Sequence, residues 1–138
     1  MARIVSIDYG SKRVGLAVTD PLQIIATALD TVASREVIEY LKKYLQNEPV
    51  ELFVVGEPKR LNNTPAQSAP LVNQFVKLLE KTFPAIPIAM HDERFTSKMA
   101  FQSMIDSGMK KSERRNKENI DKISAVIILQ SYLESIKK

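Results

Sequence analysis

The stretch at residues 51–56 constrains the fold more than any other part of this 138-residue sequence. It reads Glu-Leu-Phe-Val-Val-Gly, and its four successive apolar residues are typical of a β-strand that is buried on both faces. A strand of this kind needs a paired strand on each side and a layer of helices over each face. With the helical segments before and after it in the sequence, such a strand predicts an α/β protein.

The other apolar patterns predict what surrounds it. Short or alternating apolar runs indicate strands, and apolar residues three and four apart indicate helices. Ser34 is expected to cap the first helix, and the second begins either at the capping-box sequence of residues 64–67 or after Ser68, because Pro70 is awkward inside a helix. The strands are expected at residues 4–8, 14–18, 24–29, 51–56 and 88–90, and the helices at 34–47, over 71–79, from 96 or 97 to 108, and at 119–133.

This order, β-β-β-α-β-α-β-α-α, predicts the topology. Three strands joined by short connections are expected to be antiparallel neighbours, and the two right-handed helical crossovers add parallel strands beside the first. A mixed five-stranded sheet with helices on both faces results. The last strand follows Pro87 and is therefore expected at a sheet edge.

Composition limits the class of protein and of metal site. Residues 1–138 are most simply one domain. There is no cysteine and one histidine, which excludes disulfides, thiolate sites and multi-histidine zinc sites, so a bound metal would be an oxygen-liking ion such as Mg²⁺ or Mn²⁺. The absence of a signal-peptide pattern and of an apolar run of about 20 residues predicts a cytoplasmic protein with no membrane partner.

Acidic residues follow the ends of the strands that should run parallel. The first strand ends at Asp8, the fourth is followed by Glu57, and the fifth by Asp92 and Glu93. Because ligands bind beyond the carboxyl ends of parallel strands, these acids are expected at one edge of the sheet. Asp121, in the expected first turn of the last helix, is either a fourth contributor or ordinary helix-start chemistry. Gathered carboxylates repel one another unless a cation neutralises them, as two metal ions do in phosphodiester hydrolysis.

Basic residues flank these acids. The turn after the first strand carries Lys12 and Arg13, and Arg94 follows Glu93. Residues 109–122 hold six basic and three acidic side chains, in a protein of net charge +4. We interpret the cations as contacts to nucleic-acid phosphates, recognised by shape and backbone; the alternatives are a solvated turn, a solvated helix face and, for Arg94, an ion pair with a neighbouring acid. The further contacts expected in this basic segment are Lys110, Lys111, Arg114 and Arg115.

Four motifs together resemble the YqgF/RuvX family, whose members are Holliday-junction-resolvase-like proteins of the ribonuclease H superfamily and are regarded as pre-16S rRNA nucleases. The resemblance covers almost the whole chain. The motifs are residues 8–15 with 18–20, residues 54–56 with Pro58, residues 92–97, and residues 121–133.

The resemblance implies a ribonuclease H-like fold and a divalent-metal-dependent nuclease acting in 5′-end processing of pre-16S rRNA. Position by position, the metal-binding and catalytic acids of the family fall on Asp8, Glu93 and Asp121. The chain departs from the family pattern after the fourth strand, where Glu57 replaces an apolar residue; this leaves open whether Glu57 approaches the metal.

Other functions remain open. A Holliday junction resolvase acting on branched DNA, or a non-catalytic RNA-binding factor of the same fold, would have the same motifs. A phosphotransferase of the actin and sugar-kinase type needs a second domain, for which 138 residues leave no room. Tyr9 is expected to pack in the protein rather than to stack on a base, and His91 to be structural. The oligomeric state is left as monomer or homodimer.

Overall fold

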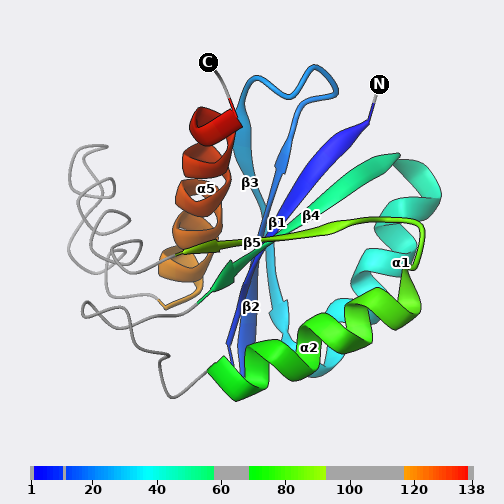
Figure 1. The fold of residues 1–138 in the computed structure, drawn as a ribbon. Helices are drawn as coiled ribbons and strands as arrows, with labels where there is room; N and C mark the ends of the chain where they lie inside the picture. The colour runs from blue at the N-terminus through cyan, green and yellow to red at the C-terminus, as the bar shows by residue number, and fades with distance from the viewer. Residues whose placement is uncertain (1, 11, 58–68, 93–116, 137–138) are drawn as a thin grey trace.

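The computed structural model describes residues 2–10, 12–57, 69–92 and 117–136, with the backbone alone at 57, 69, 92 and 117–123. Figure 1 shows a twisted sheet with α5 on one face and α1 and α2 on the other. The elements are β1 (Arg3–Tyr9), β2 (Arg13–Thr19), β3 (Ala26–Ala33), the 3₁₀ turn η1 (Ser34–Glu36), α1 (Val37–Asn47), β4 (Val50–Glu57), α2 (Ala69–Thr82), β5 (Ile88–Asp92) and α5 (Lys117–Ile136).

The sheet has the predicted topology. Its strand order is β3-β2-β1-β4-β5. The strands β1, β2 and β3 pair antiparallel, whereas β4 pairs parallel with β1 and β5 parallel with β4. The strand after Pro87 lies at the edge, as expected, and the carboxyl ends of β1, β4 and β5 point to the same end of the sheet. The predicted α/β class and mixed sheet are confirmed.

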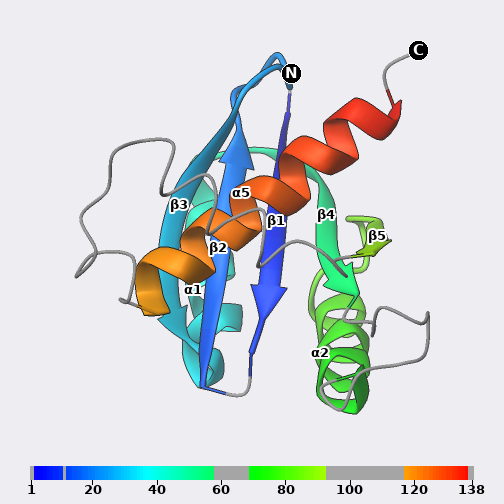
Figure 2. The same cartoon turned by 90° about the vertical axis from the view of Figure 1, so that its left-hand side faces the viewer.

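The strand β4 is buried on both faces, as the apolar run predicted. Phe53 and Val55 belong to the core under α1 and α2, while Val54 belongs to the core under α5. The view of Figure 2 shows α5 crossing one face of the sheet, with α1 behind it. None of the helices in the described ranges is both long and apolar enough to cross a membrane.

The third strand begins later than predicted. Ile24 and Ile25 were expected to open it, but it runs from Ala26 to Ala33. The carboxylate of Asp20 accepts hydrogen bonds from the backbone N–H groups of both isoleucines, at 2.8 Å each, and so holds them in the preceding turn. A polar side chain outside the apolar run therefore decides where the strand starts.

Helix starts also differ from the sequence prediction. The prediction that Ser34 caps the first helix is wrong: Ser34 opens η1, α1 begins at Val37, and neither element has a side-chain cap. The Ser34 N–H instead donates to the Lys12 carbonyl (3.0 Å), which ties residue 34 to the β1–β2 turn. The helix α2 begins at Ala69, which fits a start after Ser68 and leaves Pro70 in the first turn, where its missing N–H costs little.

The last helix begins before its expected start at residue 119. Because α5 starts at Lys117, Asp121 is its fifth residue and lies in the second turn rather than the first. The helix dipole acts mainly within the first turn, so this position weakens the reading of Asp121 as ordinary helix-start chemistry. The capping-box sequence at 64–67 and the helix expected up to residue 108 lie outside the described residues.

Candidate active site at the carboxyl end of β1

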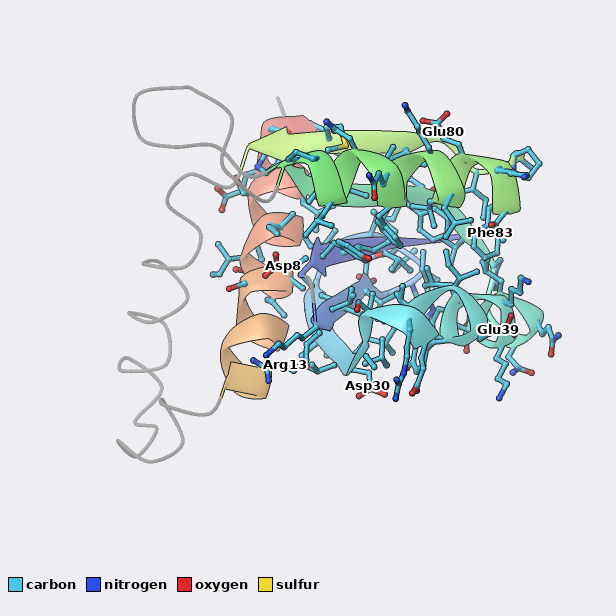
Figure 3. The ribbon with its side chains drawn as sticks, turned by 90° about the horizontal axis from the view of Figure 1, so that it is seen from below. Asp8, Arg13, Asp30, Glu39, Glu80 and Phe83 are labelled. Atoms are coloured by element: carbon cyan, nitrogen blue, oxygen red, sulfur yellow. The ribbon has the colours of Figure 1, made fainter. Side chains whose placement is uncertain are left out.

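Asp8 lies near the carboxyl end of β1, on the face of the sheet that α5 covers. Side chains alternate between faces along a strand, and Ile4 and Ser6 of β1 both meet α5: Ile4 packs in the core under this helix, and the Ser6 hydroxyl donates to the carbonyl of Ala125 at 2.6 Å. Asp8 therefore faces the same side, and Figure 3 shows it beside α5. Its half-buried position leaves the carboxylate within reach of solvent.

Glycines flank Asp8 on both neighbouring strands. Asp8 pairs with Gly15 of β2, and since Ile7 pairs with Val55, the next residue on each strand places Asp8 beside Gly56 of β4. Neither glycine has a side chain, so neither neighbouring strand places a side chain beside Asp8 at this level of the sheet. The two-residue alternation was visible in the sequence, but the register that places both glycines at the level of Asp8 was not.

The hairpin turn after β1 places positive charge at the same end of the sheet. The Gly10 N–H donates to the Arg13 carbonyl at 3.0 Å, and a Cβ at residue 10 would lie only 2.7 Å from that oxygen. Close approach of the backbone, rather than a positive φ, thus favours glycine at this position. Lys12 is exposed, and Figure 3 shows Arg13 beside the first turns of α5, on the same side as Asp8.

The helix α5 brings Asp121 toward Asp8. The Ser6 hydroxyl fixes Ala125 to β1, and Asp121 precedes Ala125 by one helical turn. Figure 2 shows the first turns of α5 on the part of the sheet toward which β1 runs. The backbone of residue 121 thus lies at the same end of the sheet as Asp8.

Two further predicted site residues follow directly on β5. His91 of this strand pairs with Gly56, and so lies in the same cross-strand row as Asp8. Glu93 and Arg94 follow the last residue of β5 in the sequence, and they lie outside the described residues. The basic residues Lys110, Lys111, Arg114 and Arg115 lie outside them as well.

His91 and Tyr9 have structural contacts, as the sequence analysis expected. The Nε2 atom of His91 is hydrogen-bonded to the Ser131 hydroxyl at 2.8 Å, and the ring meets Tyr132 edge-on at 6.3 Å, so this histidine joins β5 to α5. Tyr9 faces the other side of the sheet, where its ring stacks on Phe75 with centroids 4.3 Å apart. The packing role of both residues is confirmed.

The donor atoms at this site fit a hard divalent cation. Asp8 supplies carboxylate oxygens, and the chain has no thiolate to offer. Within the described ranges, no three acids or histidines lie close enough together to hold a metal ion. Of the three expected ligands, the structure describes the side chain of Asp8 alone, so the complete set stays a prediction.

Comparison with known proteins gives a consistent result. A family model described as "RuvX: Holliday junction resolvase" matches residues 2–135. The relative named "Putative pre-16S rRNA nuclease" in Christiangramia forsetii is 55% identical over 133 residues, which cover 96% of this chain and 98% of the relative. A relative of the same name in Parabacteroides distasonis is 53% identical, with 99% and 98% covered.

Among solved structures, the chain is similar to RuvC of T. thermophilus in complex with a Holliday junction substrate. The TM-score is 0.60 at 16% sequence identity, and the match covers 99% of this chain and 97% of that one. A second T. thermophilus RuvC structure matches with a TM-score of 0.54. At this level of identity the likeness concerns the fold, and it confirms the predicted ribonuclease H-like architecture.

Proposed function

Because the chain belongs to the RuvX family, we propose that it cleaves a precursor of 16S rRNA, using a divalent metal ion held by Asp8, Glu93 and Asp121. The protein is a nuclease, a hydrolase of phosphodiester bonds with a nucleic-acid substrate. Nucleases of this kind generally depend on a divalent metal ion. The choice of substrate, the three ligands and the identity of the ion as Mg²⁺ or Mn²⁺ are the proposal.

The observation that carries the proposal is the position of Asp8. Its carboxylate stands at the carboxyl end of the central strand β1, between two glycines and beside α5. An acid at this place would be costly without a cation, since Glu93 and Asp121 belong to segments that lead to the same end of the sheet. Three converging carboxylates suit Mg²⁺ or Mn²⁺, which prefer oxygen ligands.

In the proposed site, the acidic residues would hold the metal ion and the basic residues would bind phosphates. When bound, the divalent ion would supply a Lewis acid at the phosphate and lower the pKa of a bound water. Asp8, Glu93 and Asp121 would fix the position of that charge. Lys12 and Arg13, with Arg94 and the basic residues of the segment 109–122, would hold phosphates on either side of the cleaved bond, which orients the substrate without reading its sequence.

The decisive test is the Asp8→Asn variant in a metal-dependent cleavage assay on precursor rRNA. The amide keeps the shape of the side chain and removes its charge, so we expect cleavage to fall at least about a hundredfold with the fold unchanged. Glu93→Gln should behave in the same way. Glu80→Gln is the matched control, because Glu80 is an exposed residue of α2 away from Asp8 (Figure 3) and should leave the rate unaltered.

The same assay also tests two alternative functions, cleavage of branched DNA and RNA binding without catalysis. A four-way DNA junction is tested beside the rRNA precursor, because the matched family model is described as a Holliday junction resolvase; faster metal-dependent cleavage of the junction would replace the rRNA proposal. If the Asp8 variant and the parent bind RNA equally and neither cleaves it with any metal, the protein is an RNA-binding factor and the catalytic proposal fails.

A further inference from the structure

A cavity of about 400 Å³ lies behind the candidate site, on the opposite face of the sheet from Asp8. It opens between the end of β1, the start of α1 and the first half of α2. The core under α1 and α2 fills the space beneath it. Its lining includes the charged residues Arg35 and Glu39, the amide of Gln74, and the apolar or aromatic residues Tyr9, Leu71, Phe75 and Leu78.

The walls of this cavity suit a flat, apolar group. Tyr9 and Phe75 stack on each other with an angle of 13° between their planes, and Phe75 is 4% exposed, so the exposed apolar wall is that of Leu71 and Leu78. Leu71 and Leu78 lie two turns apart on α2, and they are 42% and 48% exposed although both are large apolar residues. Nucleobases are flat, largely apolar on their faces, and bind to proteins by stacking on such surfaces.

The rim carries polar groups that suit the rest of a nucleotide. The side chain of Arg35 is 89% exposed and stands 4.0 Å from Glu36. Lys12 is close by, because its carbonyl accepts the Ser34 N–H at 3.0 Å, and its side chain is exposed. The Gln74 amide in the lining can both donate and accept hydrogen bonds, which matches the edge of a base.

The cavity and the proposed catalytic carboxylate involve adjacent residues of β1. Tyr9 directly follows Asp8, and successive side chains of a strand point to opposite faces. A single strand of nucleic acid that passes over the end of β1 can therefore present a phosphate to Asp8 and a neighbouring base to the cavity beside Tyr9. Lys12 supplies positive charge at the rim, where Arg35 lies 4.0 Å from Glu36 and Glu39 lines the cavity.

We propose that this cavity binds an unpaired nucleobase of the substrate next to the cleaved bond, with its phosphate against Lys12 and Arg35. The inference rests on the proposed function in one respect: it takes the substrate to be a nucleic acid. It adds a substrate class, because a base can enter the cavity only from a single-stranded or unpaired segment. Precursor RNA with an unpaired segment at the cleavage point fits this requirement, and a continuous duplex does not.

The test uses the absence of tryptophan from the chain. Leu78→Trp places a fluorescent reporter in the cavity wall, and Leu22→Trp places one in the turn between β2 and β3, where Leu22 is 58% exposed. Both are titrated with a short single-stranded RNA in the Asp8→Asn background and with a chelator in place of divalent metal, so that nothing is cleaved whether or not Asp8 is catalytic. We expect saturable quenching of the reporter at residue 78 and none at residue 22.

An abasic strand of the same length separates the base from the phosphates. It keeps the backbone charge and lacks the flat group, so it should not quench the reporter at residue 78. Two results would overturn the proposal that the cavity binds a base. One is quenching by the abasic strand as strong as by the normal strand, and the other is equal quenching of both reporters by the normal strand.

A second variant links the cavity to affinity. Leu71→Glu puts a charge into the wall at a partly exposed position, so folding should be preserved. We expect about tenfold weaker binding of single-stranded RNA, as for loss of one stacked base, and unchanged binding of a duplex. Equal losses for both substrates would overturn the proposal. Because these readouts are binding measurements, they do not depend on whether Asp8 is catalytic, and the two proposals can fail separately.

Discussion

At the scale of single residues, the site depends on one buried hydroxyl. Ser6 is fully buried on β1, two residues before Asp8, and its hydrogen bond of 2.6 Å to Ala125 is the contact that sets α5 against this strand. A hydroxyl at this depth needs a partner, because an unpaired polar group in the core is costly. The same contact therefore stabilises the fold and fixes the distance between Asp8 and the turn that carries Asp121.

Replacing this hydroxyl should weaken both stability and cleavage. Ser6→Ala is expected to lower the free energy of unfolding by about 1 kcal/mol, measured by denaturant unfolding, and to slow metal-dependent cleavage because α5 is less firmly placed. Ser135→Ala is the matched control: its hydroxyl also donates to a helix carbonyl at 2.6 Å, that of Tyr132, but it is exposed to solvent. An equal loss of stability in both variants would refute the role given to Ser6.

At the scale of elements, the turn between β2 and β3 is organised by one carboxylate. Asp20 accepts backbone hydrogen bonds from Leu22, Ile24 and Ile25, and Gln23 adopts a left-handed conformation with φ of 59°. These hydrogen bonds, those from Ile25 and Ile24 above all, lower the pKa of Asp20 because they favour its charged form. Three large apolar side chains are thereby held in an exposed turn.

The contribution of this turn to the stability of the protein should decrease in acid. Because the pKa of Asp20 is lowered in the folded protein, its contribution to stability is complete above the ordinary aspartate pKa of about 3.9 and is lost as the pH falls through the lowered value. Asp20→Asn is therefore expected to be less stable than the parent at neutral pH, with the difference closing in acid. The amide NMR signals of Ile24 and Ile25 report the titration directly, and a midpoint at or above the ordinary value would contradict this account.

The elements also show how far the sequence could predict the fold. Apolar runs and periodicity located every described strand and α-helix at least in part, and chain order was enough to predict the topology. Boundaries failed where a side chain outside the periodic pattern decided them. Ile24 and Ile25 look like the start of a strand until Asp20 is seen to fold them into a turn, and Ser34 looks like a cap until its N–H is seen to bond to Lys12.

Part of the candidate site could also be predicted from chain order. Asp8 could be found from chain order, since it ends a strand whose neighbours are parallel. The glycines beside it could not, because the level of Gly15 and Gly56 depends on strand register, which emerges only when the sheet is assembled. The cavity beside Tyr9 likewise joins β1 to two helices that are separate in sequence.

At the scale of the whole molecule, the two ends of the sheet differ in chemistry. The end with Asp8 also carries the basic turn of Lys12 and Arg13, whereas the other end carries the Asp20 turn and its exposed apolar side chains. Nucleic acid is attracted by clustered positive charge, so it should approach the first of these ends.

Affinity for RNA should therefore fall steeply with salt, because binding releases counterions from the phosphates. We expect Lys12→Gln to make the plot of log affinity against log salt shallower by roughly 0.7–0.9, the change for one lost phosphate contact. Lys43→Gln, at an exposed lysine of α1, is the matched control and should leave the slope unchanged. An affinity that stays constant from low to high salt would exclude recognition through the backbone.

The order in which the two faces of the sheet are covered has a consequence for biosynthesis. The helices α1 and α2 follow the strands that they cover closely in the chain, but α5 follows all five strands. During translation the apolar residues Ile4, Ala17 and Val54 of the face that carries Asp8 therefore lack their packing partners on α5 until this helix has emerged. Under the proposed function, Asp121 comes into place only with this helix, so a nascent chain lacks one of the three proposed metal ligands until then.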